Sequence, residues 1–433
     1  MTGSRPPALP SGSTTSGPRV GLFGLLGSGN LGNDGSLEAV LGYLRVEHPN
    51  VVVDLMCPHP DEIVRRYGLP AVRLHWNRSE YQTAAGARAI ITKAIGKVLD
   101  TIRTAAWVRR HEAVIVPGMG VLEATLPLRP WGFPYSLFLL CASGRLFDTK
   151  VALVSVGANA DGKPATRRLL TSAARLAFYR SFRDAHSKKA VQLAGVDVSK
   201  DSVYPDLAFA LPTPPDGNDG VRTVGVGVMY YHGTENDRHR ADVVHSVYVA
   251  KLRKFIQWLV DRGYRVRLFT GDHEDDLVVK AVIEYVHAWR PDLEPSWLVA
   301  EPVTSLTDLM RQMALVDNVV ATRYHNVLCA VKMGKPTVSI GYSAKNDDLM
   351  ASMGLGEFCQ DIDTLDVKRL IDQFIALEAR REHLHAAMAR QNATIAGELA
   401  DQFAVLSEVL FSSERTPVNK HSPAPEPLPK ETP

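Results

Sequence analysis

Short apolar runs alternate with longer segments of helical periodicity along most of the chain. The runs are nearly continuous and rich in β-branched residues, and the pattern restarts in the second half. Strands that are apolar on both faces are typical of a parallel sheet covered by helices on either side. The runs that we expect to form strands are 19–26, 51–56, 113–118, 151–157, 223–229, 265–270, 318–322 and 337–340.

A break rich in proline and glycine separates the two halves. Residues 211–220 read LPTPPDGNDG, and we interpret them as a linker because turn-forming residues dominate the stretch. The chain has 433 residues, which is more than a single hydrophobic core usually supports. The pattern therefore predicts an α/β protein with two Rossmann-like lobes, 19–210 and 221–411, that face a cleft.

The ends of the chain and its last helical segment differ from the alternating pattern. Residues 1–18 and 412–433 contain little that a core could bury, so we expect two disordered tails. Residues 380–410 have the periodicity of one long helix, which we assign to the second lobe. The folded protein is expected to end with this helix.

Composition excludes some classes of function. Lys and Arg total 49 and Asp and Glu total 47, without the basic excess of a nucleic-acid-binding protein. No apolar run approaches the roughly 20 residues of a membrane span, and the N-terminus lacks the apolar core of a secretory signal. Wide spacing of the cysteines favours buried thiols in a reducing cytoplasm over disulfides or a zinc site. They are Cys57, Cys141, Cys329 and Cys359.

A glycine-rich loop follows the first expected strand. The sequence GSGNLG (27–32) matches the spacing GxGxxG, and Asp54 ends the second expected strand, as in a dinucleotide-binding motif. A tight strand-to-helix turn would need the same glycines for positive φ angles. A third interpretation is a loop that lines the cleft and contacts an anionic or saccharide ligand. The residues that would line it are Gly29, Asn30, Asn33 and Asp34.

Basic side chains follow two strand ends in the stretch 316–355. Arg323 and His325 come directly after one expected strand. Tyr342 and Lys345 come after the next. The carboxyl ends of neighbouring parallel strands meet at one edge of a sheet, next to helix N-termini. A guanidinium, an imidazole and an ammonium at that edge would suit a small, highly charged anion.

Several segments resemble motifs of the polysaccharide pyruvyl transferase family, in the same order along the chain. Three residues depart from the family pattern: Asn33 precedes Asp34, Met119 replaces the middle glycine of a triplet, and Thr322 replaces a leading glycine. The matching segments are GNLGNDG (29–35), EAVIVPGMGVLEA (112–124), FRDAHSKKAVQLAG (182–195), YPDLAFAL (204–211) and TRYHNVLCAVKMGKPTVSIGYSAK (322–345).

The resemblance implies a GT-B-like architecture and an activity in polysaccharide biosynthesis for the cell envelope. The implied reaction moves a pyruvyl group from phosphoenolpyruvate, as co-substrate, to two hydroxyls of a saccharide or lipid-linked saccharide, giving a ketal. It also implies that Arg183, His325 and Lys345 serve this donor. Arg323 would support them.

The chemistry of this reaction suits those residue types. The donor carries a carboxylate and a phosphate, which fixed cations bind well, and Arg can bind either group through two hydrogen bonds. Ketal formation needs an acid–base group that works near neutral pH, so we expect His325 to be catalytic. Its place at a helix N-terminus should lower its pKa. We expect neither a metal nor a tightly bound cofactor.

Structural and functional alternatives remain open from the sequence alone. His325 could be a satisfied helix-start histidine and Lys345 a surface lysine, while Arg183 and Arg323 could each pair with an acid. Asp206 is as well explained by a turn as by a ligand. On the same fold, a nucleotide-sugar glycosyltransferase or a catalytically silent glycan-binding protein would be the competing functions.

A basic amphipathic segment covers residues 87–110. Asp100 is the only acid within it. The apolar face predicts a helix that packs on the core with a solvated basic side. The alternative is peripheral contact with anionic lipid at the inner face of a membrane. The apolar face consists of Ile91, Ile95, Val98 and Ile102.

Overall fold

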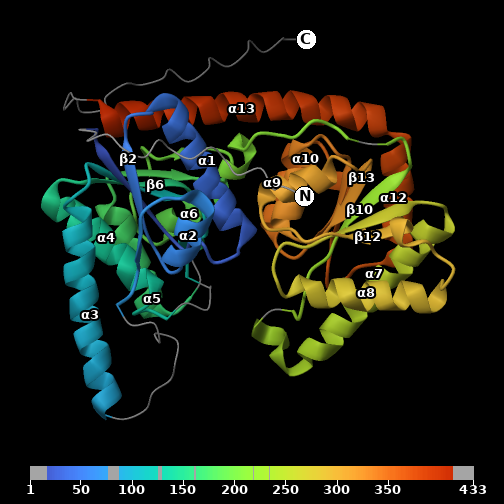
Figure 1. Ribbon diagram of the computed structural model, residues 1–433, viewed down its shortest axis with the longest axis horizontal. Coiled ribbons are helices and arrows are strands. Elements are labelled where there is room, and N and C mark those ends of the chain that lie inside the picture. Colours follow the sequence, from blue (N-terminus) through green and yellow to red (C-terminus); the bar gives the residue numbers. More distant parts are fainter. Residues whose placement is uncertain are drawn as a thin grey trace, which may run out of the picture.

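The computed structural model describes residues 17–76, 87–124, 129–159, 162–217, 219–233 and 235–412. Over these residues the chain forms two α/β lobes that lie side by side, each built on a parallel sheet (Figure 1). The prediction of two Rossmann-like lobes is therefore confirmed. The tails predicted to be disordered are 1–18 and 412–433, and all of their residues except 17, 18 and 412 lie outside the described residues.

The first lobe has a sheet of order β3-β2-β1-β4-β6-β8-β9. Strand β1 pairs with β2 on one side and β4 on the other, so the chain is wound in both directions from the centre. Its strands are β1 (Arg19–Phe23), β2 (Val52–Cys57), β3 (Ala71–Arg73), β4 (Ala113–Pro117), β6 (Lys150–Val156), β8 (Tyr179–Phe182) and β9 (Ser202–Val203). A small separate sheet pairs β5 (Leu122–Glu123) with β7 (Ala158–Asn159). The helices are α1 (Leu31–Glu47), α2 (Pro60–Tyr67), α3 (Ala87–Val108), α4 (Phe133–Phe147), α5 (Pro164–Leu176), α6 (Ala185–Leu193) and the 3-10 helix η1 (Leu207–Ala210).

The second lobe repeats this plan with a sheet of order β12-β11-β10-β13-β14-β15. Strands β10, β13 and β14 are buried along their whole length, as their apolar sequences predict. The strands are β10 (Thr223–Gly227), β11 (Arg265–Phe269), β12 (Leu298–Ala300), β13 (Asn318–Ala321), β14 (Thr337–Gly341) and β15 (Cys359–Asp361). The helices are α7 (Ala241–Asp261), α8 (Asp275–Trp289), α9 (Leu306–Met313), α10 (Tyr324–Lys332), α11 (Ala344–Ser352), α12 (Val367–Ala379) and α13 (Arg381–Phe411), with 3-10 helices η2 (Glu235–Arg240), η3 (Pro295–Trp297) and η4 (Gly356–Phe358).

Helix α13 contacts both lobes, not the second lobe alone as the sequence pattern suggested. It runs across the top of the molecule in Figure 1. Near its start, Asn392 Nδ2 donates to the Val331 carbonyl at 3.0 Å in the second lobe. Near its end, Gln402 Nε2 donates to the Ser181 hydroxyl at 3.0 Å in the first lobe. One amphipathic helix therefore completes the packing of both lobes.

Helix α3 differs from the prediction of a core-facing apolar surface. Ile95, Val98 and Ile102 are 53–60% exposed, while the Asp100 side chain on another face is buried. Asp100 accepts a hydrogen bond from the Trp76 backbone N–H at 2.7 Å and lies 3.3 Å from Lys97 Nζ. The helix thus docks through Asp100 and, at its C-terminal end, through the buried side chains of Trp107 and Val108, whereas the predicted stripe faces outwards. The side chains of residues 87–91, including Ile91, lie outside the described part.

Candidate active site

The predicted site residues come together where the two lobes meet. Arg183 follows β8 in the first lobe, while His325 and Lys345 lie at the starts of α10 and α11 in the second. The ring of Tyr324 lies close to both Arg183 and Lys345. Its centroid is 5.9 Å from the Arg183 guanidinium carbon and 5.9 Å from Lys345 Nζ. Strand ends from both lobes therefore supply one cationic cluster.

Arg183 is the most enclosed cation of this cluster, with its side chain 9% exposed. Its Nη2 donates to Glu123 Oε1 at 2.8 Å, and its other nitrogens lie 3.6–3.7 Å from carboxylates of Asp184 and Asp206. The buried Nε has no hydrogen-bond acceptor within the described residues. The guanidinium is therefore paired by charge with three carboxylates, while its Nε forms no hydrogen bond.

His325 lies against the first lobe through Gly32. A Cβ on Gly32, the second residue of α1, would lie 1.9 Å from His325 Cε1 and 2.2 Å from its Nε2. Glycine is therefore required at this point of α1 by close approach, because any side chain would overlap the imidazole. This contact fixes where the ring lies relative to both lobes.

Burial is the largest cause that lowers the pKa of His325 to about 4; Asp206 opposes the shift, and the cations Arg183, Lys345 and Arg323 add to it. The direction agrees with the prediction from sequence, but desolvation is the main cause rather than the helix N-terminus. At neutral pH the imidazole is thus uncharged in the unliganded protein. A bound dianion would replace part of the lost solvation of the charged form and raise the pKa again.

Arg323 forms an internal ion pair, the alternative that the sequence left open for this residue. Its Nε and Nη2 donate to the two carboxylate oxygens of Asp275 at 3.0 and 2.6 Å. Asp275 is fully buried and also accepts backbone N–H bonds from Tyr230 and Gly271. The pair therefore joins the ends of β10, β11 and β13. Arg323 fixes the loops around the site.

Lys345 and Tyr342 come from the segment after β14. Lys345 Nζ lies 4.0 Å from Glu123 Oε1 in the other lobe, and burial lowers the pKa of this lysine. Burial raises the pKa of Tyr342, although a backbone hydrogen bond from Tyr324 and the charge of Arg323 oppose the shift. Tyr342 therefore stays neutral beside the cations. Both residues lie where the sequence placed them, next to Arg323 and His325.

The glycine loop is largely occupied by its own hydrogen bonds. Gly27 and Gly29 have φ angles of 70° and 82°, which only glycine adopts readily. Asn30 caps α1 by accepting from the Asn33 N–H, and Asn33 Nδ2 donates to the Leu25 carbonyl. Asp34 is buried and accepts from the Gly27 N–H at 2.9 Å. We expected Gly29, Asn30, Asn33 and Asp34 to line a cleft. The three polar side chains instead bond within the turn, whereas Gly29 lies close to His273 of the second lobe.

Asp54 does not occupy the position of a ribose-binding acid. It accepts a hydrogen bond from Trp107 Nε1 at 2.6 Å and pairs with Arg19 at 2.9 Å and His111 at 3.0 Å. These bonds lower the pKa of the Asp54 carboxyl despite its burial. The carboxylate oxygens of Asp54 are already bonded, and the His325 ring occupies the space beside Gly32. The interpretation of the glycine loop as a dinucleotide-binding motif therefore loses its support.

The departures from the family pattern have local explanations. Met119 has a φ of 65°, the left-handed region that favours glycine, and a Cβ on Gly24 would lie 2.3 Å from the Met119 Cε. The side chain thus fills space that Gly24 leaves free, at the cost of a strained backbone. The hydroxyl of Thr322 is buried 2.9 Å from the Tyr248 hydroxyl. Asn33 bonds within the loop as described above.

Sequence reasoning did not identify Tyr324 and Glu123 as members of the site. Tyr324 lies inside the motif TRYHN, and Glu123 is the last residue but one of a segment that matches the family through its glycines, but neither stands out by residue type. Asp206, for which the sequence allowed a turn or a ligand, accepts from the Ala208 N–H at 3.0 Å and lies 3.7 Å from Arg183. These residues follow short or irregular elements, where no periodicity marks them.

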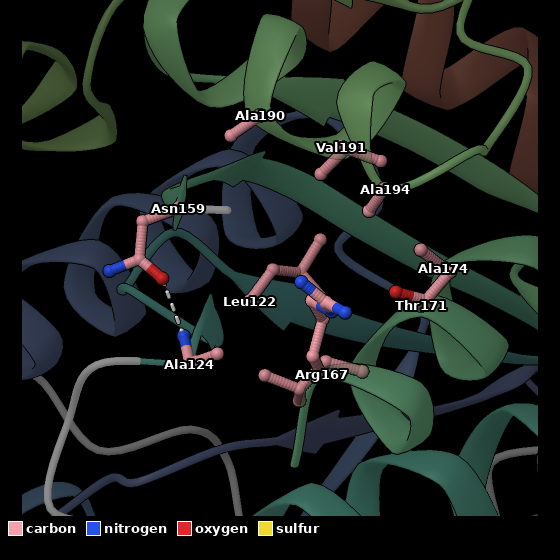
Figure 2. A pocket seen from close by; sticks show the side chains of 10 residues that line it. Leu122, Ala124, Asn159, Arg167, Thr171, Ala174, Ala190, Val191 and Ala194 are labelled. Atoms are coloured by element: carbon pink, nitrogen blue, oxygen red, sulfur yellow. Dashed lines mark hydrogen bonds between the residues drawn. The ribbon is translucent and has the colours of Figure 1, made fainter. Parts of the chain in front are cut away.

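The neighbourhood of β5 includes a small pocket of the first lobe (Figure 2). Figure 2 shows Asn159 bonded to the Ala124 backbone, with Oδ1 accepting at 2.7 Å. Most of the lining is apolar, with Arg167 as its charged side chain. Leu122 and Ala124, on either side of Glu123, both line this pocket, so alternation along the strand directs Glu123 to the other face. The pocket therefore backs the strand that carries Glu123.

Comparison with known families decides the relationship of this chain. A sequence model of the family described as polysaccharide pyruvyl transferase matches residues 30–344. The chain belongs to the polysaccharide pyruvyl transferase family. The match begins at Asn30 inside the glycine loop, includes Glu123, Arg183 and the segment through Arg323 and His325, and ends one residue before Lys345. No curated protein sequence matches the chain.

Solved structures resemble this pyruvyl transferase family member in fold. UDP-GlcNAc 2-epimerase from Neisseria meningitidis, bound to UDP-GlcNAc, is 12% identical with a TM-score of 0.59 over 91% of this chain and 99% of that one. HepE from Anabaena, in complex with UDP-glucose, is 11% identical with a TM-score of 0.55 over 90% and 99%. UDP-GlcNAc 2-epimerase from Methanocaldococcus jannaschii is 10% identical with a TM-score of 0.53 over 82% and 91%. At these identities the likeness shows a GT-B-type fold and nothing about the substrate.

All four cysteines are free thiols, three of them buried and Cys359 partly so. Within the described ranges, His, Cys, Asp and Glu side chains form no group of three that could hold a metal ion. No helix in the described part of this pyruvyl transferase family member is long and apolar enough to cross a bilayer.

Proposed function

We propose that this protein transfers the pyruvyl group of phosphoenolpyruvate to two hydroxyls of a saccharide, forming a pyruvate ketal and releasing inorganic phosphate. The observation that carries the proposal is the cluster of Arg183, Lys345 and His325 at the junction of the lobes. The two cations Arg183 and Lys345 suit a small molecule with both a carboxylate and a phosphate.

The proposed chemistry assigns a proton transfer to His325. The donor's negative charges would raise the pKa of the neutral imidazole, so that it is protonated when the donor is bound. It then delivers a proton to the methylene carbon of the donor while a hydroxyl oxygen attacks the adjacent carbon. Phosphate departs, and the second hydroxyl closes the ring. A positioned acid of this kind typically contributes about 10²–10⁴ in rate.

Incubation with phosphoenolpyruvate and a panel of glycans, followed by mass spectrometry, tests this function. The expected result is one saccharide that gains a ketal-linked pyruvyl group, with release of inorganic phosphate. Titration calorimetry adds a second criterion, because phosphoenolpyruvate should bind without any acceptor. Binding of a uridine diphosphate instead would favour a nucleotide-sugar glycosyltransferase. Binding of neither, with retention of glycans, would identify a silent glycan-binding protein.

Lys345→Ala is expected to weaken phosphoenolpyruvate binding while the melting temperature stays near that of the wild type. Lys345 is partly exposed and its acidic neighbour Glu123 keeps Arg183, so little structural support is lost. A hydrogen bond to a charged group contributes about 1.5–3 kcal/mol, so the Kd measured by titration calorimetry should rise about 10–100-fold. Lys189→Ala, which removes an exposed lysine of α6, is the matched control and should bind normally. If Lys345→Ala binds phosphoenolpyruvate as tightly as Lys189→Ala does, Lys345 is not part of the donor site.

Arg183→Ala is a less direct test of the donor site. Its removal would leave Glu123, Asp184 and Asp206 without their shared cation at a site with little access to solvent. Breaking a buried ion pair by deleting one partner costs about 3–5 kcal/mol. Loss of donor binding in that variant would therefore mix an effect on the site with an effect on the fold.

We also propose that the acceptor is lipid-linked and that the protein meets it at the inner face of a membrane through α3. The helix carries an exposed apolar face, Ile95, Val98 and Ile102, and the exposed tryptophans Trp76 and Trp131 lie beside it. Its only acid is buried, whereas Lys93, Arg109 and Arg110 are exposed. An apolar face with tryptophans and basic residues is the arrangement that binds the interface of an anionic bilayer.

The triple variant Ile95→Ser, Val98→Ser, Ile102→Ser is expected to lose binding to vesicles of phosphatidylglycerol and phosphatidylcholine. Burying one such side chain contributes about 1.5–3 kcal/mol, so the affinity measured by co-sedimentation should fall more than ~10-fold. Binding of the wild type should also weaken with salt and on neutral vesicles, because the basic residues contribute.

The double variant Val243→Ser, Val247→Ser removes comparable exposed apolar residues from α7 and should bind vesicles like the wild type. Equal binding by the α3 and α7 variants would dismiss the α3 face. A wild type that self-associates through the same residues, and ignores vesicles, would assign the face to a second copy of the chain.

A further inference from the structure

Glu123 is placed where the proposed donor must bind. Its Oε1 accepts from Arg183 Nη2 at 2.8 Å and lies 4.0 Å from Lys345 Nζ, so a single carboxylate oxygen contacts cations of both lobes. Its side chain is 17% exposed. A carboxylate between a guanidinium and an ammonium has the charge and the contacts that the carboxylate or phosphate of a bound anion would have.

The backbone around Glu123 is shaped for this position. A Cβ on Gly120 would lie 2.5–2.8 Å from the Glu123 carboxyl atoms, and a Cβ on Gly157 would lie 2.6–2.9 Å from the Arg183 guanidinium. Both charged groups therefore lie directly over glycine backbone. Asn159 holds the next residue, Ala124, through its N–H, which fixes the strand from which Glu123 projects (Figure 2).

The acids near Arg183 differ in how firmly they are held. Asp184 caps α6 by accepting from the Ser187 N–H at 2.6 Å, and Asp206 accepts from the Ala208 N–H at 3.0 Å. Among the described residues, the Glu123 carboxylate accepts its hydrogen bond from Arg183 alone. It is thus the acid that can leave when an anion takes over the two cations, because no backbone bond has to break.

We propose that Glu123 is the general base of the transfer reaction, held on Arg183 and Lys345 until the donor displaces it. This inference rests on the proposed function. Once displaced, the carboxylate remains on the same strand beside the donor site and has lost its partners. A free carboxylate within reach of an acceptor hydroxyl can take that proton as the oxygen attacks.

The proton balance closes with His325 and Glu123 together. The imidazolium of His325 gives its proton to the donor methylene carbon, which becomes the methyl group, while the first hydroxyl oxygen bonds to the adjacent carbon and gives its proton to Glu123. The carbon–oxygen bond to phosphate then breaks, and the departing phosphate takes the proton from Glu123. The second hydroxyl bonds to the same carbon and returns its proton to His325. Both side chains regain their starting states, and no oxidant or metal is needed.

Glu123→Gln is expected to slow turnover and, at the same time, to tighten donor binding. Its kcat should fall at least ~10²-fold because the base is lost. Its KM and Kd for phosphoenolpyruvate should fall about 10-fold, because a competing ionic hydrogen bond is removed from the donor site. Glu123→Asp keeps a carboxylate and should recover part of the turnover. Glu301→Gln, which removes an exposed carboxylate paired with Arg267 at 3.1 Å, should change neither constant.

A purely structural Glu123 predicts a different pattern. Arg183 would lose its closest partner, so both the melting temperature and the affinity for phosphoenolpyruvate would decrease in the Gln variant. A raised Kd, or an unchanged kcat, would overturn the proposal. Failure of the proposed function is recognised separately, since the wild type would then show no binding of phosphoenolpyruvate at all.

Discussion

His325→Gln is expected to keep the fold and donor binding but to lose about 10²-fold or more in turnover, the lower range for a lost general acid or base. The imidazole lies among Arg183, Lys345 and Arg323, against Gly32 of the other lobe. Glutamine fills a similar volume and still forms hydrogen bonds, but it cannot deliver a proton. Steady-state kinetics with phosphoenolpyruvate and the identified acceptor measure this loss as the ratio of the two kcat values.

Stability against pH provides an independent check on His325. Its pKa in the folded protein is lowered to about 4, below the value of about 6.5 in an unfolded chain. The unfolded state therefore binds more protons between these values, and the wild type loses stability as pH falls from about 6.5 towards 4. The Gln variant should lack this contribution, which thermal unfolding at several pH values would show.

His186→Gln is the matched control, because His186 is an exposed histidine three residues from Arg183 in the sequence. It should have ordinary turnover and an unchanged dependence of stability on pH. A folded His325→Gln enzyme with ordinary turnover would end the catalytic assignment. A lower melting temperature with normal turnover would leave His325 as a structural histidine at a helix start.

Gly32→Ala should inactivate the enzyme almost as strongly, although position 32 carries no functional group. The added methyl would overlap the imidazole of His325, which must move by about an ångström or more. Displacement of a catalytic group on that scale can cost about 10²-fold in rate. The loss should appear mainly in kcat, since the donor-binding cations do not touch Gly32.

The same helix offers the control for this substitution. Gly42 has no atom within 4 Å of its Cβ position, so Gly42→Ala adds a methyl in open space. Replacing glycine inside a helix with alanine stabilises it by roughly 0.5–1 kcal/mol, so this variant should melt slightly higher and remain active. Full activity in Gly32→Ala would show that the His325 ring can shift without consequence, and would weaken its role.

The sequence predicted the parts of the fold that depend on continuous burial. Strands such as β4 and β10 are buried along their length and appear where the apolar runs placed them. Edge strands such as β9, with two exposed residues, and β3 were missed because nothing in their sequences distinguishes them from loops. Local periodicity records burial, and edges of sheets are only partly buried.

The sequence predicted only those site residues whose type and position after a strand themselves indicate a binding or catalytic role. His325 and Lys345 follow strand ends, and the sequence placed them at one rim for that reason. It gave no indication that Glu123, far along the chain, would contact the cations, because that contact depends on how two lobes meet. The loop residue Asn33 was over-interpreted, since a polar group in a turn can be satisfied by the turn itself.

The exposed face of α3 illustrates the opposite limit. An apolar stripe predicts that a helix faces a core, yet Ile95, Val98 and Ile102 face outwards. The helix is held instead through the buried Trp107 and Val108 at its end and through Asp100, whose hydrogen bonds to His75 and Trp76 do not show in a pattern of apolar positions. Periodicity shows that a helix is amphipathic, but not which of its faces the protein itself covers.

Helix α13 also has a consequence for the order in which the chain can fold during synthesis. The first lobe leaves the ribosome early, but its surface includes partners for residues near the end of the chain: Tyr43 stacks on Phe403, and Ser155 bonds to Gln402. Lys150 donates to the Val409 carbonyl at 2.9 Å. Domains usually fold from the N-terminus as they emerge. Here the lobe made first is completed last, because the ring of Tyr43 and the side chains of Ser155 and Lys150 lack these partners until α13 has been made.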